Sequence, residues 1–175
     1  QAPAGARSWD IVLSPYVRDR WQYHQLTINY RTPTEIMAVA ADVLAELDPA
    51  LRPPDSVRAN GFVPWSRRVD VDELEDAVRD GIAEAVEGTV VVIAPDGVSI
   101  DIGCDVLTPR QSKGLEFDTV VVVEPDRILA GDPRGAADLY VALTRATQRL
   151  GVIHTAPLPA MLRRLSTRYP VSSPR

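Results

Sequence analysis

The chain has 175 residues, 45% hydrophobic and 25% charged, with a formal net charge of −5. These values are those of one ordinary globular domain, and they exclude a globally basic nucleic-acid-binding protein, though not a local basic strip. The only cysteine, Cys104, excludes an internal disulfide and suits a reducing cytoplasm. Because no apolar run approaches the length of a membrane span, we expect a cytoplasmic protein with no membrane partner.

The beginning of the chain predicts a strand followed by a capped helix. The segment "QLTINY" (25–30) reads as a short apolar strand, and apolar residues then recur at helical spacing over 34–48. Thr32 is the expected N-cap, Pro33 occupies the first helical position, and Glu35 completes a capping box.

The rest of the chain continues the alternation of strands and helices. The expected elements are an extended segment (61–69), an amphipathic helix (70–87), strands at 88–95, 104–108 and 117–124, a helix at 136–148, a strand at 149–155 and a short helix at 158–166. This order predicts an α/β fold with a parallel sheet and helices on both faces.

Polar residues cluster where such a sheet binds ligands, at the carboxyl ends of its strands. Tyr30 and Arg31 end the first predicted strand, the loop 108–113 follows another, and Arg145 lies late on the predicted helix 136–148.

The stretch "SKGLEFDTVVVVE" (112–124) places Glu116 and Asp118 at the start of an apolar run. A buried strand tolerates charge poorly, so a carboxylate there is either a solvated end or a working group.

The basic residues are nearly all arginines, and Lys113 is the only lysine. A P-loop requires a lysine followed by Ser or Thr, whereas Lys113 is followed by Gly and Leu. The chain therefore has no P-loop of its own, and we expect that by itself it does not hydrolyse ATP.

Three segments in order carry a family resemblance. "LTINYRTPTEI" (26–36) is similar to motif IV, "VLTPRQSKGLEFDTVVV" (106–122) to motif V and "LYVALTRATQRL" (139–150) to motif VI of UvrD/Rep-type superfamily-one helicases. The chain resembles the second RecA-like domain of these motors, most closely in the HelD-like ATPases that act on RNA polymerase. This implies a RecA-like fold, related to P-loop NTPases but lacking the P-loop.

The resemblance implies that the domain completes an ATP cleft. An N-terminal RecA-like domain of the same protein would supply the P-loop and hold Mg²⁺. Arg31 and Arg145 would be the catalytic arginines that meet the γ-phosphate, since a guanidinium fork matches the charge developing in phosphoryl transfer. A solvated arginine is the alternative for each.

Other site residues follow from the same resemblance. Tyr30 would stack on adenine, although a core tyrosine is the alternative, and Glu116 would accept hydrogen bonds from the ribose hydroxyls. Gly114 would allow a tight turn beside the nucleotide. Lys113 would contact a phosphate or brace the turn.

Nucleic-acid contacts are implied at Thr108 and Arg110. Arg110 stands where the family usually has His, which weakens the expectation of strand tracking, although arginine can reach a phosphate. Only about 75 residues separate Arg31 from Val106, too few for the large inserted domain of the repair helicases. The compact HelD-like branch is therefore favoured.

The expected organisation is an N-terminal extension (1–20) that ends a preceding segment, the motor domain (21–168) and a tail (169–175). The partners implied are the N-terminal RecA-like domain and DNA or RNA polymerase. The alternatives are a DNA repair helicase domain and a non-catalytic RecA-like interaction module. His24 and His154 lack partners at metal-ligand spacing, so no metal site is expected.

Overall fold

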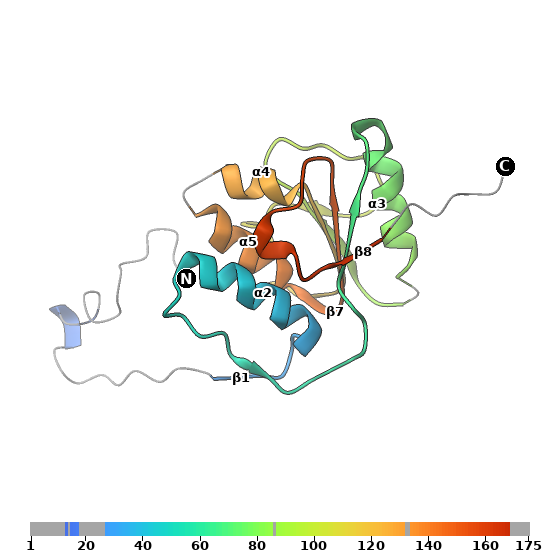
Figure 1. Cartoon of the computed structure of the whole chain (residues 1–175). Helices are drawn as coiled ribbons and strands as arrows, with labels where there is room; N and C mark the ends of the chain where they lie inside the picture. The colour runs from blue at the N-terminus through green and yellow to red at the C-terminus, as the bar shows by residue number, and fades with distance from the viewer. Residues whose placement is uncertain (1–12, 14, 18–26, 86, 132–133, 169–175) are drawn as a thin grey trace.

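The computed structural model describes residues 13, 15–17, 27–85, 87–131 and 134–168. The predicted N-terminal extension and tail lie largely or wholly outside these ranges, as does His24. Within them, strands alternate with helices along most of the chain (Figure 1). The strands are β1 (Ile28–Asn29), β2 (Asp55–Ser56), β3 (Trp65–Arg68), β4 (Val90–Ile93), β5 (Val106–Leu107), β6 (Phe117–Val123), β7 (Ala146–His154) and β8 (Ser166–Thr167). The helices are α2 (Thr34–Leu47), α3 (Leu74–Ala83), α4 (Pro125–Ala130) and α5 (Gly135–Leu143), with 3₁₀ turns η1 (Val71–Glu73) and η2 (Ala160–Leu162).

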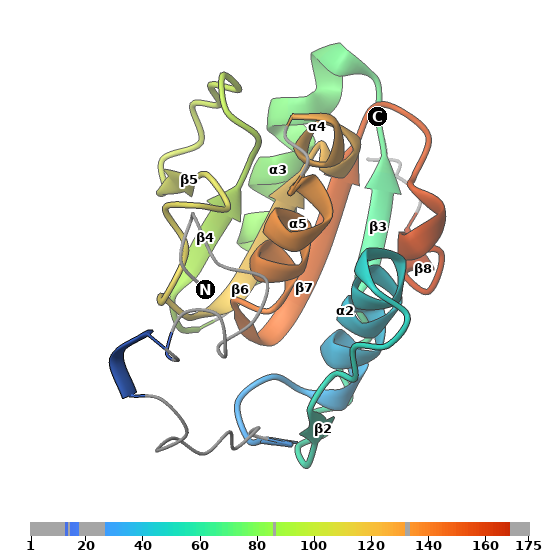
Figure 2. The same ribbon diagram turned by 90° about the vertical axis from the view of Figure 1, so that its left-hand side faces the viewer.

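Six strands form one parallel sheet in the order β5-β4-β6-β7-β3-β8 (Figure 2). The two longest strands, β6 and β7, lie side by side in the middle, with Val120 opposite Leu150 and Val122 opposite Val152. Runs of β-branched residues suit strands that are buried on both faces.

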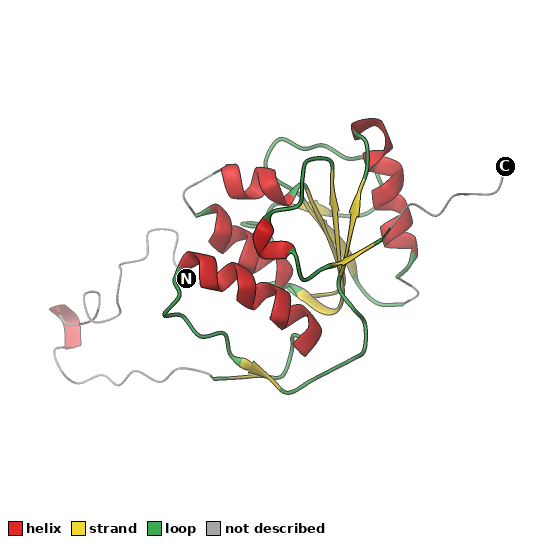
Figure 3. Ribbon diagram, viewed as in Figure 1, coloured by secondary structure: helices red, strands yellow, loops and turns green. Residues whose placement is uncertain are grey.

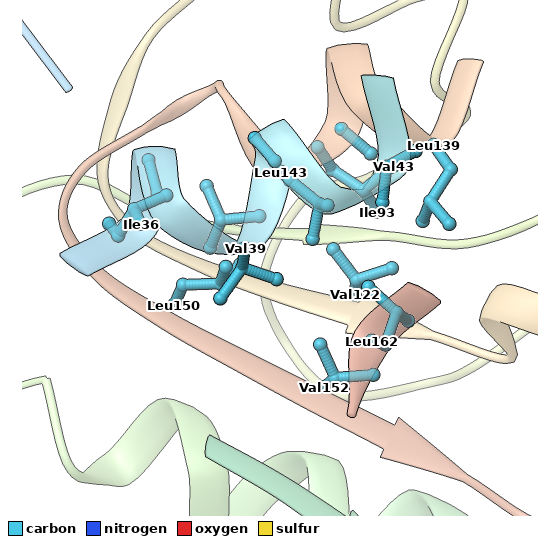
Figure 4. Close-up of a cluster of buried hydrophobic side chains, with 14 of the residues drawn as sticks. Ile36, Val39, Val43, Ile93, Val122, Leu139, Leu143, Leu150, Val152 and Leu162 are labelled. Carbon is cyan, nitrogen blue, oxygen red and sulfur yellow. The ribbon is translucent and has the colours of Figure 1, made fainter. Parts of the chain in front are cut away.

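Helices cover both faces of this sheet, as predicted (Figure 3). On one face, α2, α4 and α5 pack against β4, β6 and β7. Figure 4 shows this cluster, with α2, α5 and η2 contributing side chains above the strands. Its labelled residues are Ile36, Val39, Val43, Ile93, Val122, Leu139, Leu143, Leu150, Val152 and Leu162.

The other face is covered by α3 and closed by Trp65. The Trp65 ring lies over Gly151 of the neighbouring strand so closely that a Cβ at Gly151 would be 2.4 Å from Trp65 Cζ2. Val78 of α3 is fully buried in this second cluster. None of the helices in the described part of the chain is long and apolar enough to cross a membrane.

The first predicted strand is wrong in extent and in place. Only Ile28–Asn29 of it is extended among the described residues, and it pairs in parallel with β2 in a separate two-stranded sheet. This small sheet lies beyond the amino ends of the main strands (Figure 2). Tyr30 and Arg31 therefore do not end a strand of the main sheet.

The predicted capping box at the start of α2 is also wrong. Pro33 is the residue before the helix, and no side chain caps it. The Glu35 carboxylate instead accepts hydrogen bonds from the backbone N–H groups of Gly61 (2.8 Å) and Asn60 (3.2 Å). It thereby fixes the segment that leads into β3.

The predicted helix 136–148 ends five residues early, at Leu143. Thr144 Oγ1 donates to the carbonyl oxygen of Tyr140 at 2.9 Å and also lies within hydrogen-bond distance of the Val141 carbonyl. Such side-chain bonds compete with the helical ladder. Strand β7 begins at Ala146, so Arg145 lies in the turn between α5 and β7 and not on the helix.

Smaller differences concern element lengths. The predicted helix 70–87 is a 3₁₀ turn followed by α3, which ends at Ala83. The predicted helix 158–166 contains only the short turn η2, and its last residue begins β8. Helix α4 was not predicted.

Candidate functional site

The predicted arginines and carboxylate meet at the amino ends of β6 and β7. The Phe117 N–H, at the start of β6, donates to the carbonyl oxygen of Arg145 at 3.0 Å. Glu116 precedes β6 directly, and its carboxylate lies 3.3 Å from Nη1 of Arg31. The prediction that Arg145 lies at the carboxyl ends of strands is therefore wrong, because the turn that carries it leads into β7, whereas Glu116 lies directly before β6, at the start of the apolar run, as expected.

The Arg145 side chain is held in place by its own domain. Nε donates to the carbonyl oxygen of Val141 (3.1 Å), Nη1 to that of Leu115 (2.9 Å) and Nη2 to Thr144 Oγ1 (3.4 Å). Burial, and then the charge of Arg31, lower the pKa of the Arg145 guanidinium, while Glu116 acts in the opposite direction. The group stays charged near neutrality because arginine starts from so high a value.

Arg31 and Glu116 form an exposed ion pair. Their side chains are 42% and 59% accessible, so the pair contributes little to folding. An ion pair whose members both remain open to solvent can exchange partners with a ligand at small cost. The pair links two segments that are far apart in sequence.

Two tyrosines border this cluster. Tyr30 is 72% exposed, which removes the alternative of a core tyrosine and leaves its ring face accessible. Tyr140, on α5, was not singled out from the sequence. Burial raises the pKa of Tyr140, and the charges of Arg145 and Arg31 oppose that rise, which places its hydroxyl near both arginines. No spacing rule marks Tyr140 in the sequence, because residues five apart do not share a helix face.

The loop between β5 and β6 carries Lys113 and Gly114. Gly114 has a φ of +82°, in the left-handed region that glycine adopts without strain in a tight turn. Lys113 Nζ lies 3.5 Å from a carboxylate oxygen of Asp138 on α5. This contact favours the bracing role over a phosphate contact.

Asp118, the second carboxylate at the start of β6, holds three strands together. It accepts hydrogen bonds from the backbone N–H (2.8 Å) and hydroxyl (3.0 Å) of Thr89, from Gln148 Nε2 (2.9 Å) and from the Thr147 hydroxyl (3.3 Å). The bonds from Thr89, followed by that from Gln148, lower its pKa. Asp118 is thus a structural group, whereas Glu116 faces solvent.

Thr108 and Arg110 lie at the opposite edge of the sheet, where β5 ends. They line an open cavity of about 420 Å³ together with Arg127 of α4 and with Asp96 and Asp138. Arg127 and Asp138 were missed at the sequence level, because no motif marks them. Thr108 Oγ1 accepts the Gln111 N–H at 3.3 Å, so this side chain also stabilises the loop.

The cluster of Arg31, Glu116 and Arg145 has hydrogen-bonding groups beyond those that its internal contacts use. A guanidinium has five N–H donors, and the three hydrogen bonds described for Arg145 use three of them. Glu116 uses one carboxylate oxygen for Arg31. Among the residues that the structure describes, no three His, Cys, Asp or Glu side chains are grouped so that they could hold a metal ion.

Comparison with known proteins supports the motif assignment in part. Residues 103–153 match the family model described as the UvrD-like helicase C-terminal domain. This range contains the whole of the motif V and motif VI segments but not the motif IV segment at 26–36. No curated protein matches the chain.

A solved structure shares the fold. The crystal structure of the C-terminal domain of a possible DNA helicase from Lactobacillus plantarum WCFS1 superposes with a TM-score of 0.59, at 18% identity, covering 81% of this chain and 98% of that one. At this identity the likeness concerns the fold, and the mixed α/β architecture with its parallel sheet is confirmed as RecA-like. Residues 103–153 of this chain are therefore similar to the UvrD-like helicase C-terminal domain, and the chain shares its fold with the C-terminal domain of a possible DNA helicase.

Proposed function

We propose that the chain is the second motor domain of an ATP-driven UvrD-like helicase or translocase. Its partner is an N-terminal RecA-like domain of the same protein, which supplies the P-loop. The observation that carries the proposal is the convergence of Arg31, Glu116 and Arg145, from three separate segments, at one edge of the sheet.

Arg145 acts as the catalytic arginine in this proposal. Three hydrogen bonds fix its guanidinium before any substrate arrives, so little reorganisation is needed at the moment of reaction. Its remaining donors stabilise the charge that spreads over the transferred phosphoryl group. Arg31 is the second cation, and it moves from Glu116 to the phosphate when ATP binds.

Glu116 and Tyr30 orient the rest of the nucleotide. Once Arg31 turns to the phosphate, both Glu116 oxygens accept hydrogen bonds from the ribose hydroxyls. The exposed Tyr30 ring offers a face for the adenine. In this proposal Mg²⁺ would be held by the partner domain and would neutralise phosphate charge there.

In this proposal, nucleic acid binds at the cavity of about 420 Å³ that lies where β5 ends. Thr108 and Arg110 come from the motif V segment, and the structure adds Arg127 to the same cavity. Arginine contacts to phosphates position a strand without reading its sequence.

We further propose that the motor acts on RNA polymerase, as the HelD-like ATPases do. It is supported by what lies between Arg31 and Val106, where the described residues form α2, β2, β3, α3 and β4 of one domain. The repair-helicase insertion is absent from this described part of the chain.

The proposal is tested by ATP hydrolysis in the protein that joins this domain to a P-loop domain. The rate is measured alone, with single-stranded DNA, with duplex and with RNA polymerase, in the wild type, in Arg31→Ala and in the control Arg164→Ala, whose ion pair with Asp42 is remote from the site. We expect Arg31→Ala to lower every rate by at least about tenfold, a smaller loss than that of an arginine finger, and Arg164→Ala to change none.

Each stimulation pattern has a separate meaning. Stimulation by RNA polymerase supports the HelD-like form, whereas stimulation by DNA alone with strand separation refutes that form and leaves a DNA helicase. Hydrolysis that is insensitive to Arg31→Ala argues for the interaction module.

A further inference from the structure

The loop from Thr108 to Glu116 joins the two edges of the sheet. It leaves β5 at the carboxyl edge, beside the cavity, and enters β6 at the amino edge, beside Arg145. Both proposed functions, nucleic-acid contact and nucleotide contact, therefore have residues on one short segment.

This loop is tied to α5 at one point and to the turn that follows α5 at another. At its beginning, Asp138 lies 3.4 Å from Nε of Arg110 and 3.5 Å from Nζ of Lys113. At its end, the Leu115 carbonyl accepts the hydrogen bond from Arg145 Nη1.

Asp138 is an unusual residue for its position. Its side chain is 12% accessible, whereas those of Arg110 and Lys113 are 49% and 39% accessible. A carboxylate this deeply buried requires partners, and the contacts with its oxygens include two cations of the loop. The cations, being half-exposed, can turn toward another anion, while Asp138 cannot leave.

We propose that Asp138 is a positioning residue that couples the two sites, by holding the loop 108–116 on α5 through Arg110 and Lys113. The inference rests on the proposed function. A nucleic-acid phosphate competes with Asp138 for Arg110. When the phosphate takes Arg110, the loop shifts along α5, and its far end alters the contact between Leu115 and Arg145. Couplings between sites commonly change affinity about 5- to 150-fold.

The test uses the chain itself, with short oligo(dT) as the probe. The Nε–H resonance of Arg145 is followed by NMR during titration, because this group donates to Val141 and reports on the turn. The wild type, Asp138→Asn and the control Asp42→Asn are compared. Asp42 also pairs with an arginine distant in sequence, Arg164, but away from the loop.

We expect the Arg145 resonance to shift in the wild type and in Asp42→Asn, and to remain still in Asp138→Asn. Asp138→Asn should also bind oligo(dT) several-fold more tightly, since a competitor of the phosphate has been removed. A residue that only supports the fold would weaken binding, so the sign of this change separates the two roles.

Lys113→Gln is the second variant, since its side chain is half-exposed and its loss spares the core. It should reduce the shift of Arg145 without affecting the fold. The inference is overturned if oligo(dT) leaves Arg145 unmoved in the wild type, or if Asp138→Asn responds as the wild type does. Either result leaves the catalytic proposal intact, because that proposal depends on turnover and not on this resonance.

Discussion

Replacing Asp118 with Ala should destabilise the domain by about 2–3 kcal/mol. Four hydrogen bonds end on this carboxylate, and they join the segment before β4 to the first residues of β6 and β7. A bond to a charged group contributes about 1.5–3 kcal/mol when buried. Since Asp118 is partly accessible and water can replace the lost acceptor, the total is closer to the value of one such bond than to four.

Urea unfolding of the chain measures this loss as a lower midpoint at an unchanged slope. The control is Asp105→Ala, which removes an exposed aspartate directly before β5. Its free energy of unfolding should stay within about 0.5 kcal/mol of the wild type. The folded pKa of Asp118 is lowered, so its contribution is complete above its unfolded value of about 3.9 and is lost as the pH falls through the folded value. A loss below about 0.5 kcal/mol, or one that persists unchanged at strongly acid pH, would refute this reasoning.

Three further predictions concern the chain by itself. It should bind ATP with a Kd in the millimolar range or weaker, on the order of 4 kcal/mol or less, since half a cleft leaves its arginines solvated; calorimetry showing micromolar binding would place the site elsewhere. Arg110→Ala should reduce the salt dependence of single-stranded DNA binding by about one charge, a slope change near 0.7, and an unchanged slope would remove Arg110 from the interface. Gly151→Ala should destabilise the fold by about 1–3 kcal/mol because its Cβ would meet the Trp65 ring, and a melting temperature equal to that of the wild type would contradict this packing.

The sequence predicts the centre of the sheet well because long apolar runs have few alternatives. The runs around Val91 and Val121 are buried on both faces, and β4 and β6 appear where they were expected. The two-residue strands β1, β5 and β8 carry too little periodicity to fix their pairing. Consequently the placement of β1 in a separate sheet, and the existence of β8, required the structure.

The candidate site residues were named from the sequence, but their geometry was not predicted. No Gly or Pro marks the end of α5, so the helix was extended through Arg145, whereas the Thr144 hydroxyl bonds back to the helix at its last turn. Asp138 carries no motif and is recognised only through the two cations that it contacts. Both are tertiary effects, which local patterns do not encode.

The central claim is that Arg145 meets the γ-phosphate, and kcat for ATP hydrolysis by Arg145→Ala tests it most directly. The variant is made in the protein that also carries the P-loop domain. We predict that kcat falls on the order of 10³-fold or more, the range of arginine fingers, while ATP affinity changes far less, because ground-state binding lies mainly on the P-loop domain. A kcat near that of the wild type would contradict the account.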